Sequence, residues 1–260
     1  MMTNEAIWRE FLAWLPSAPP AGSPLALFGQ YGERLAAGGC SVAERARHLA
    51  VVQQLMHERT DGWRFIFNNI YASGRADFAT EPTALLVSTV ERLPPGRALD
   101  IGMGQGRNAV FLATRGWEVT GFDISDAGLA IARANAERAG VALTAVRASE
   151  REFEYGIDQW DLVVFTYEPF PIASPDYVAT LRRSMKAGGL IVIESFSEPE
   201  GASNRTAVAI DPDRLLDAFK AFRLIHFEDK IGQPDWADER RIVRMVAEAR
   251  IAATGIQSSP

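Results

Sequence analysis

Three glycines at alternate positions follow an apolar run near the middle of the chain. The run covers residues 97–102 and ends in Gly102, and Gly104 and Gly106 come after it. Glycine lets the backbone turn sharply and approach a ligand closely, because it has no Cβ, and a helix that starts after such a turn presents unpaired N–H groups. The next apolar run ends in Asp123, whose carboxylate can accept hydrogen bonds from two ribose hydroxyls. This order of strand, glycine turn, helix and acid predicts a site for an adenosine-containing cofactor.

An acidic residue inside the first run, Asp100, indicates which cofactor the glycine turn suits. Dinucleotide sites carry the spacing Gly-x-Gly-x-x-Gly, whereas this chain has Gly-x-Gly-x-Gly with Asp100 two positions before Gly102. A carboxylate at that place would repel a pyrophosphate group and would suit a ligand that carries an ammonium group. S-adenosylmethionine has an ammonium group, a sulfonium group and an adenosine but no phosphate. These residues therefore favour it over a nicotinamide dinucleotide.

The segment 97–125 resembles the first two motifs of class I S-adenosylmethionine-dependent methyltransferases, especially small-molecule enzymes of the tellurite-resistance and thiopurine-methyltransferase type. The resemblance covers residues 65–247 in organisation and is specific only within 97–125. It implies that S-adenosylmethionine is the cofactor and that Asp100 lies near its ammonium group. It also implies that the following residues line the methionine, ribose and adenine parts of the cofactor: Gly102, Met103, Gly104, Asp123 and Ile124.

The ends of the third and fourth apolar runs are expected to complete the site. After the third run the family often has an acid that meets the adenine amino group, where this chain has Ser149 and Glu150. Either residue could accept that hydrogen bond, and an exposed acid at a helix start is the alternative for Glu150. The fourth run ends in Thr166, Tyr167 and Glu168, a corner that lies under the reactive methyl group in the family. We expect Thr166 at the cofactor and Tyr167 and Glu168 at the substrate, with packing at the sheet edge as the alternative for Tyr167.

An aromatic-rich segment at residues 63–71 precedes the part of the chain that forms the sheet. In related enzymes an N-terminal helix of this kind closes over the cofactor, and Tyr71-Ala72-Ser73-Gly74 is similar to a short Tyr-x-x-Gly element of the family. Tyr71 is therefore a candidate cofactor-binding residue on a lid, although aromatic residues at helical spacing also suit a helix core. One of Asn68 and Asn69 is expected to face the pocket. His57 is a candidate general base, with an ordinary surface or interface histidine as the alternative.

The elements that must position these residues alternate between strands and helices. Seven apolar runs predict strands at residues 97–102, 117–123, 142–148, 160–167, 189–196, 222–228 and 241–247. Helix-start signals separate several of them: Ser125, Ser174-Pro175 and Asp211-Pro212. This alternation predicts an α/β, Rossmann-like fold, with a seven-stranded, mostly parallel sheet and helices on both faces. Only 12 residues without a helical pattern join the last two runs, so the last strand is predicted to be antiparallel.

The chain before the sheet is predicted to be helical. We expect an N-terminal helical extension or lid at residues 1–80, a cofactor-binding methyltransferase domain at 81–250 and a tail at 251–260. The aromatic residues of the extension have no sheet of their own. We therefore expect them to pack against the sheet domain or against a second subunit, which leaves a homodimer open.

Composition narrows the functions further. Of 260 residues, 27 are Lys or Arg and 33 are Asp or Glu, which gives a formal net charge of -6 and disfavours a generic nucleic-acid binder. The single cysteine excludes an internal disulfide, and the three histidines are too widely spaced for a metal motif, so no metal is expected. The chain has no signal-like start and no apolar stretch of the roughly 18 residues that a membrane span needs. These features predict a cytoplasmic protein that binds no membrane.

The residues together favour an S-adenosylmethionine-dependent methyltransferase. It would move a methyl group by in-line displacement to an oxygen, nitrogen, sulfur or halide nucleophile of a small molecule. An adenosylmethionine-binding partner or regulatory protein without transfer activity is the alternative, while Asp100 and the glycine spacing count against a nicotinamide-dependent reductase. Because histidines are scarce near the predicted site, acceptors that arrive deprotonated or lose their proton late are mildly favoured.

Overall fold

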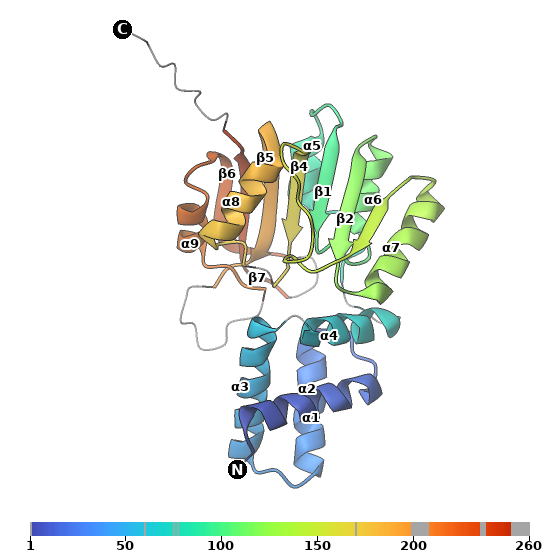
Figure 1. Cartoon of the computed structure of the whole chain (residues 1–260), viewed down its shortest axis with the longest axis vertical. Coiled ribbons are helices and arrows are strands. Elements are labelled where there is room, and N and C mark those ends of the chain that lie inside the picture. The colour runs from blue at the N-terminus through green and yellow to red at the C-terminus, as the bar shows by residue number, and fades with distance from the viewer. Residues whose placement is uncertain are drawn as a thin grey trace.

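The computed structural model of the chain describes residues 2–59, 61–74, 76, 78–169, 171–198, 208–234 and 238–250. The tail predicted at 251–260 lies outside these residues. A sheet covered by helices forms one part of the molecule, and the N-terminal helices lie against the end of the sheet at which its central strands finish (Figure 1). Ligands of open α/β sheets bind at that end.

One sheet contains seven strands in the order β3-β2-β1-β4-β5-β7-β6. The strands are β1 Arg97–Ile101, β2 Glu118–Asp123, β3 Thr144–Arg147, β4 Trp160–Thr166, β5 Met185–Phe196, β6 Arg223–Gly232 and β7 Arg240–Glu248. Strands β1 to β5 pair in parallel, whereas β7 runs antiparallel to both of its neighbours, β5 and β6. The predicted Rossmann-like sheet, mostly parallel with an antiparallel last strand, is therefore confirmed.

The helices around the sheet begin and end close to the predicted signals. They are α5 Ala84–Val90, α6 Arg107–Thr114, α7 Asp126–Ala139, α8 Pro175–Ser184 and α9 Pro212–Ala218. The Ser125 side chain caps α7 by accepting a hydrogen bond from the Gly128 N–H, and α7 ends at Gly140 in the left-handed region. The Asp211 side chain caps α9 in the same way. Local capping chemistry thus fixes where two of the helices start.

Side chains of the central strands alternate between two apolar layers. Leu99 and Val163 pack on the face that α8 and α9 cover, whereas Ala98 and Leu162 pack on the face that α5, α6 and α7 cover. Burial on both faces makes the strand sequences almost continuously apolar. An acid inside such a run, such as Asp100, is therefore conspicuous.

The N-terminal helices form a second apolar core. They are α1 Asn4–Trp14, the short 3-10 helix η1 Leu15–Ser17, α2 Pro24–Ala37, α3 Val42–Glu58 and α4 Asp61–Ala72. The ring centroids of Phe11 and Trp14 lie 5.0 and 5.1 Å from that of Tyr31. Among the described residues, Ile124 is the one member of this core that the sheet domain contributes. Most of these aromatic residues are buried against one another by the helices. The expectation that they pack on the sheet domain or a second subunit therefore holds, in the described ranges, only for Tyr71, which lies against Gly104 and Gly128 of the sheet domain.

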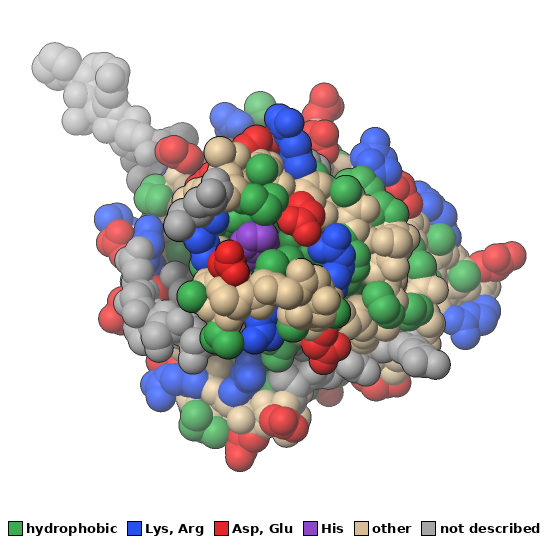
Figure 2. All heavy atoms as spheres, turned by 90° about the horizontal axis from the view of Figure 1, so that it is seen from below, with side chains coloured by type: hydrophobic (Ala, Val, Ile, Leu, Met, Phe, Trp, Pro, Cys, Tyr) green, Lys and Arg blue, Asp and Glu red, His purple; other side chains and the backbone are tan. Residues whose placement is uncertain are grey.

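Charges are mixed on the face of the helical part that points away from the sheet. Figure 2 shows Lys and Arg side chains dispersed among Asp and Glu side chains on this face, rather than gathered into one basic patch. In the described part of the chain, no helix has both the length and the apolar character needed to cross a membrane.

Candidate cofactor site

The glycine turn between β1 and α6 adopts a backbone that favours glycine. The φ angles of Gly102, Gly104 and Gly106 are +63°, +51° and +78°, all in the left-handed region. The N–H of Met103 donates to the carbonyl of Phe122 over 3.0 Å, which ties the turn to β2. The turn therefore lies between the ends of β1 and β2, as the sequence predicted.

Met103 contributes only its backbone to the surface of this turn. Its side chain is 5% exposed, and its Sδ lies 2.0 Å from where a Cβ at Gly121 would be. Gly121 thus leaves the room that Met103 fills inside the core. The predicted placement of Met103 beside the methionine part of the cofactor can involve its backbone but not its thioether.

Asp123, at the end of β2, joins the glycine turn to the start of α7. Its Oδ2 accepts a hydrogen bond from the Gly104 N–H over 2.8 Å, and its Oδ1 accepts one from the Ser125 N–H over 2.7 Å. Burial raises the pKa of Asp123 to about 6, against the effect of these backbone donors. A carboxylate has about four lone-pair sites, so this one can still accept from ribose hydroxyls.

Asp100 has a buried carboxyl oxygen that lacks a protein partner. The residue is 1% exposed, and its Oδ2 receives no hydrogen bond from the residues that the structure describes. Burial raises the pKa of Asp100 to about 7, although Arg107 and the Ala109 N–H favour the charged form. An unpaired buried carboxylate is costly, and an ammonium group of a ligand would satisfy it.

Two side chains lie directly on the glycine turn. A Cβ at Gly104 would be 2.1 Å from the Tyr71 Oη, and a Cβ at Gly102 would be 2.0 Å from the Glu168 Cδ. Burial and the charge of Asp123 raise the pKa of both Tyr71 and Glu168 well above their usual ranges. The turn therefore carries a tyrosine hydroxyl and a carboxyl group in the space above its glycines. A ligand that binds on the turn must displace them.

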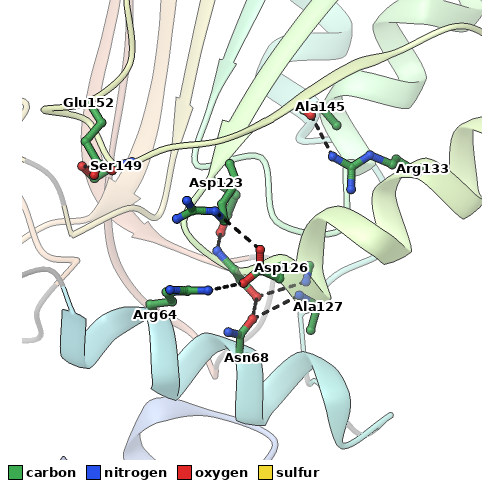
Figure 3. A network of polar contacts seen from close by, with 12 residues as sticks. Arg64, Asn68, Asp123, Asp126, Ala127, Arg133, Ala145, Ser149 and Glu152 are labelled. Carbon is green, nitrogen blue, oxygen red and sulfur yellow. Dashed lines mark hydrogen bonds and ion pairs between the residues drawn. The ribbon is translucent and has the colours of Figure 1, made fainter.

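Hydrogen bonds from α4 hold the helical part against the N-terminus of α7 (Figure 3). The Asn68 Oδ1 accepts from the Ser125 Oγ over 2.8 Å and from the Ala127 N–H over 3.1 Å. Arg64 pairs with Asp126 over 2.7 Å. Of the two asparagines singled out in the sequence, Asn68 therefore fixes α4 beside Asp123, while Asn69 donates to the Ala18 carbonyl.

Replacing Asn68 by alanine is expected to lower the free energy of unfolding by about 1–3 kcal/mol, because a part-buried hydroxyl and an N–H lose their acceptor. Arg64→Ala breaks an exposed ion pair and should cost no more than about 1 kcal/mol. Urea unfolding of both variants measures the difference. Equal losses would show that Asn68 does not anchor α4.

Several predicted site residues lie after β3 and at the end of β4, and they differ in whether their polar atoms already have a hydrogen-bond partner in the protein. The Ser149 Oγ donates to the Glu152 Oε2 over 2.9 Å, whereas the Glu150 Oε2 is buried without a hydrogen-bond partner among the described residues. Glu150 therefore has the freer acceptor of the two residues proposed for the adenine end. Thr166 is buried and accepts from Asn108 over 3.2 Å.

Tyr167 and Glu168 point to different sides of the corner after β4. Tyr167 has a φ of +55°, its hydroxyl donates to the Glu194 Oε1 over 2.9 Å, and its ring lies 5.1 Å from that of Phe196. The Glu194 Oε2 in turn accepts from Arg244 over 2.7 Å. Tyr167 thus packs in a cluster beside β5 and β7, while Glu168 reaches the glycine turn.

Sequence reasoning missed the pair of Glu194 and Arg244. Both lie within otherwise apolar strand runs, and their Cα atoms are register partners on β5 and β7. An acidic and a basic residue within two otherwise apolar strand sequences could have predicted a buried ion pair. The candidate base His57 lies in α3, and its side chain is outside the described part of the structure.

The sheet order and the glycine-acid site together define a class I S-adenosylmethionine-dependent methyltransferase domain. Residues 98–189 match the family model described as "Methyltransferase domain". The resemblance stated from the sequence is therefore confirmed for the sheet domain.

Comparison with known proteins agrees with this class. The chain is 31% identical to the ubiquinone biosynthesis O-methyltransferase of Roseobacter denitrificans over 102 aligned residues. These residues make up 39% of this chain and 41% of that protein. The chain thus spans less than half of that relative's length. Its fold is similar to that of the 1,6-didemethyltoxoflavin-N1-methyltransferase of Burkholderia thailandensis, with a TM-score of 0.59, 21% identity and coverage of 75% and 90% of the two chains. TehB from Haemophilus influenzae is similar in fold at a TM-score of 0.59 and 17% identity, over 71% and 68% of the two chains.

Proposed function

We propose that the chain transfers the methyl group of S-adenosylmethionine to a small molecule. The observation that carries the proposal is the buried, unpartnered carboxyl oxygen of Asp100 beside a left-handed glycine turn and Asp123. The donor set fits the cofactor: Asp100 would meet its ammonium group and Asp123 its ribose hydroxyls, with Glu150 as the freer acceptor at the adenine end. Ile124, expected to pack on adenine, is buried in the core of the N-terminal helices. The printed names of the relatives, an O-methyltransferase and an N1-methyltransferase of a small molecule, support a small-molecule acceptor.

The chain's own contribution to such a transfer is alignment. When bound, S-adenosylmethionine supplies a methyl group that its sulfonium already activates. Holding an acceptor in line with that methyl group is worth about 7–11 kcal/mol in well-oriented reactions. Residues at the carboxyl ends of β1, β2 and β4 lie at the edge of the sheet where ligands of open α/β folds bind, so they are placed to hold both ligands.

The direct test is a labelled-methyl assay. The full-length protein is incubated with methyl-labelled S-adenosylmethionine and a metabolite panel, and mass spectrometry detects any labelled product. We expect one small-molecule product and stoichiometric S-adenosylhomocysteine. Tight cofactor binding without a product from any acceptor class would favour the binding or regulatory protein instead.

We propose that residues 1–80 act as a lid on the domain at 81–250. The support is that Tyr71 of α4 lies on Gly104 and that Asn68 ties the same helix to α7. Tyr71 would leave the turn to admit the cofactor and then cover it. The mixture of positive and negative side chains on the outer face of the helical part (Figure 2) supports a partner other than nucleic acid. The cytoplasmic location and the homodimer stay predictions.

Tyr71→Ala is expected to speed the dissociation of S-adenosylhomocysteine about tenfold, the effect of losing about 1.4 kcal/mol, because the ring no longer covers the ligand. Stopped-flow fluorescence measures the rate. Tyr71→Phe keeps the ring and should stay close to the parent protein. An unchanged rate in a folded Tyr71→Ala variant would remove the lid role.

Affinity for the cationic cofactor is expected to rise with pH. The pKa values of Asp100 and Asp123 are raised to about 7 and about 6, and a cation binds the carboxylate forms. Affinity should therefore grow from pH 5 to pH 8, by up to about tenfold per pH unit between about pH 6 and pH 7, where Asp100 titrates, and by up to about a hundredfold per unit below about pH 6, where both carboxylates titrate. Stability of the ligand-free protein should change in the opposite direction, because folded-state pKa values above the ordinary range favour folding at low pH. Calorimetric titrations from pH 5 to pH 8 measure this affinity. An affinity that does not change with pH would contradict the assignment of Asp100 and Asp123 to the cofactor site.

A further inference from the structure

The backbone before Glu168 is fixed by contacts that direct this side chain to the glycine turn. The Tyr167 N–H donates to the Glu194 carbonyl over 3.0 Å, and the Tyr167 hydroxyl donates to the carboxylate of the same residue. With Tyr167 held in the left-handed region on one side, Glu168 extends to the other side and lies against Gly102. Glu168 is thus a carboxyl group placed between the ends of β1 and β4, where a reacting group would sit.

Glu168 sits among carboxyl groups with little opposing charge. Groups that face Glu168 or its acidic neighbours come from the elements around it: Asp100 of β1, Asp123 of β2, Glu150 after β3, Tyr71 of α4, Tyr177 of α8, and the cations Arg107 and Arg151. Arg107 acts on Asp100, and the Arg151 Nε lies 3.4 Å from the Glu150 Oε1. Within the part of the chain that the structure describes, no ion pair or hydrogen bond involves Glu168 itself.

Two buried carboxyl oxygens in this cluster lack a hydrogen-bond partner among the described residues, so a ligand could supply one. Asp100 Oδ2 and Glu150 Oε2 have no hydrogen-bond partner among the described residues, and the two residues are 1% and 8% exposed. The carboxyl groups do not converge as metal ligands would, since the described residues contain no such group of three or more His, Cys, Asp or Glu. The cluster therefore suits cationic groups and hydrogen-bond donors and opposes anions.

We propose that Glu168 is the proton acceptor of the transfer and that the methyl acceptor enters as a neutral amine or hydroxyl rather than as an anion such as a halide. This inference rests on the proposed function. The lone pair of the acceptor forms a bond to the methyl carbon, and the carbon–sulfur bond breaks with its electron pair left on sulfur. The proton of the acceptor's N–H or O–H passes to a carboxylate oxygen of Glu168. Solvent then takes that proton before the next turnover.

Electrostatics couples the protonation of Glu168 to the charge on the ligand. Burial and the negative charges of Asp123, Asp100 and Glu150 raise the pKa of Glu168, which favours its protonated form in the ligand-free protein. With a positive charge bound nearby, the pKa of Glu168 would fall and the residue would become the carboxylate that can act as a base. Once that charge is lost in the transfer, its pKa would rise again and Glu168 would keep the proton. This proposal departs from the sequence-based preference for acceptors that arrive deprotonated or lose their proton late.

Calorimetry of ligand binding tests the coupling without any knowledge of the acceptor. The full-length protein is titrated at neutral pH with S-adenosylmethionine and with S-adenosylhomocysteine, in two buffers of different ionisation enthalpy, which gives the protons released on binding. The charged ligand should release more protons than the neutral-sulfur ligand. Glu168→Gln should abolish the difference, whereas Glu137→Gln, on the exposed side of α7, should retain it. Circular dichroism checks that both variants are folded.

The possible outcomes separate the two proposals. Equal proton release by the two ligands, or an undiminished difference in Glu168→Gln, would overturn the role of Glu168 while leaving the cofactor assignment intact. Failure of both ligands to bind would overturn the proposed function and this inference with it. A second readout uses iodide, which has no proton to give, as the opposing acceptor. Transfer to an amine or hydroxyl should fall about a hundredfold or more in Glu168→Gln, whereas any transfer to iodide should not depend on Glu168. Undiminished transfer to the amine or hydroxyl in that variant, or a parent protein that methylates iodide in preference to both, would contradict the inference.

Discussion

Arg244→Met is expected to lower the free energy of unfolding by about 3–5 kcal/mol, because it leaves a buried carboxylate without its cation. Glu194 is fully buried, and its Oε2 lies 2.7 Å from the Arg244 Nε. After the substitution, the Glu194 carboxylate keeps the hydrogen bond that it accepts from the Tyr167 hydroxyl. Urea unfolding at neutral pH measures the loss.

Arg241→Met is the matched control for this prediction. Arg241 lies on the same strand, β7, but its side chain is 52% exposed where it pairs with Asp229, so its loss should cost no more than about 1 kcal/mol. Adding Glu194→Gln to Arg244→Met should recover part of the stability, since the uncompensated charge is gone. Equal losses of unfolding free energy in Arg244→Met and Arg241→Met would show that the buried ion pair stabilises the fold no more than the exposed one.

Asp123→Ala should weaken S-adenosylmethionine binding by about 1.5–3 kcal/mol, the value of hydrogen bonds to a charged acceptor, or roughly ten- to 150-fold. The structure adds a second effect. Because Asp123 also accepts from the Gly104 and Ser125 N–H groups, the variant should melt at a lower temperature.

Calorimetric titration and thermal unfolding separate the two effects of Asp123→Ala. Asp126→Ala is the control, since Asp126 is exposed at the start of the same helix and pairs with Arg64. It should bind the cofactor as the parent protein does. Parent-like affinity in a folded Asp123→Ala variant would remove Asp123 from the ribose site.

Features set by neighbouring residues in the chain could be predicted from the sequence. Ser125 and Gly140 mark the ends of α7 through capping and a left-handed turn, and alternation of strands and helices is enough to predict a parallel sheet. Strand β6 extends to Gly232, past the predicted end of its apolar run, because pairing of Gly232 with Arg240 on β7 continues the ladder. Hydrogen bonding between distant segments decided that boundary, and the apolar pattern carries no signal for it.

Contacts between distant segments decided the parts of the site that the sequence did not reveal. Tyr71 and Glu168 lie on glycines that are far from them in the chain, so no local pattern shows that they share the turn. Met103 faces the core because Gly121 on the next strand leaves room for its thioether. The aromatic residues of the N-terminal helices suit any apolar partner, and only the packed structure shows that they pack mainly against one another.

Calorimetric titration of the full-length protein with S-adenosylmethionine, S-adenosylhomocysteine and NAD tests the central assignment most directly. The site formed by Asp100, the glycine turn and Asp123 predicts micromolar binding of both adenosyl ligands, no binding of NAD, and a melting temperature that rises with adenosyl ligand concentration by mass action. Heat of binding with NAD, and none with either adenosyl ligand, would contradict the account.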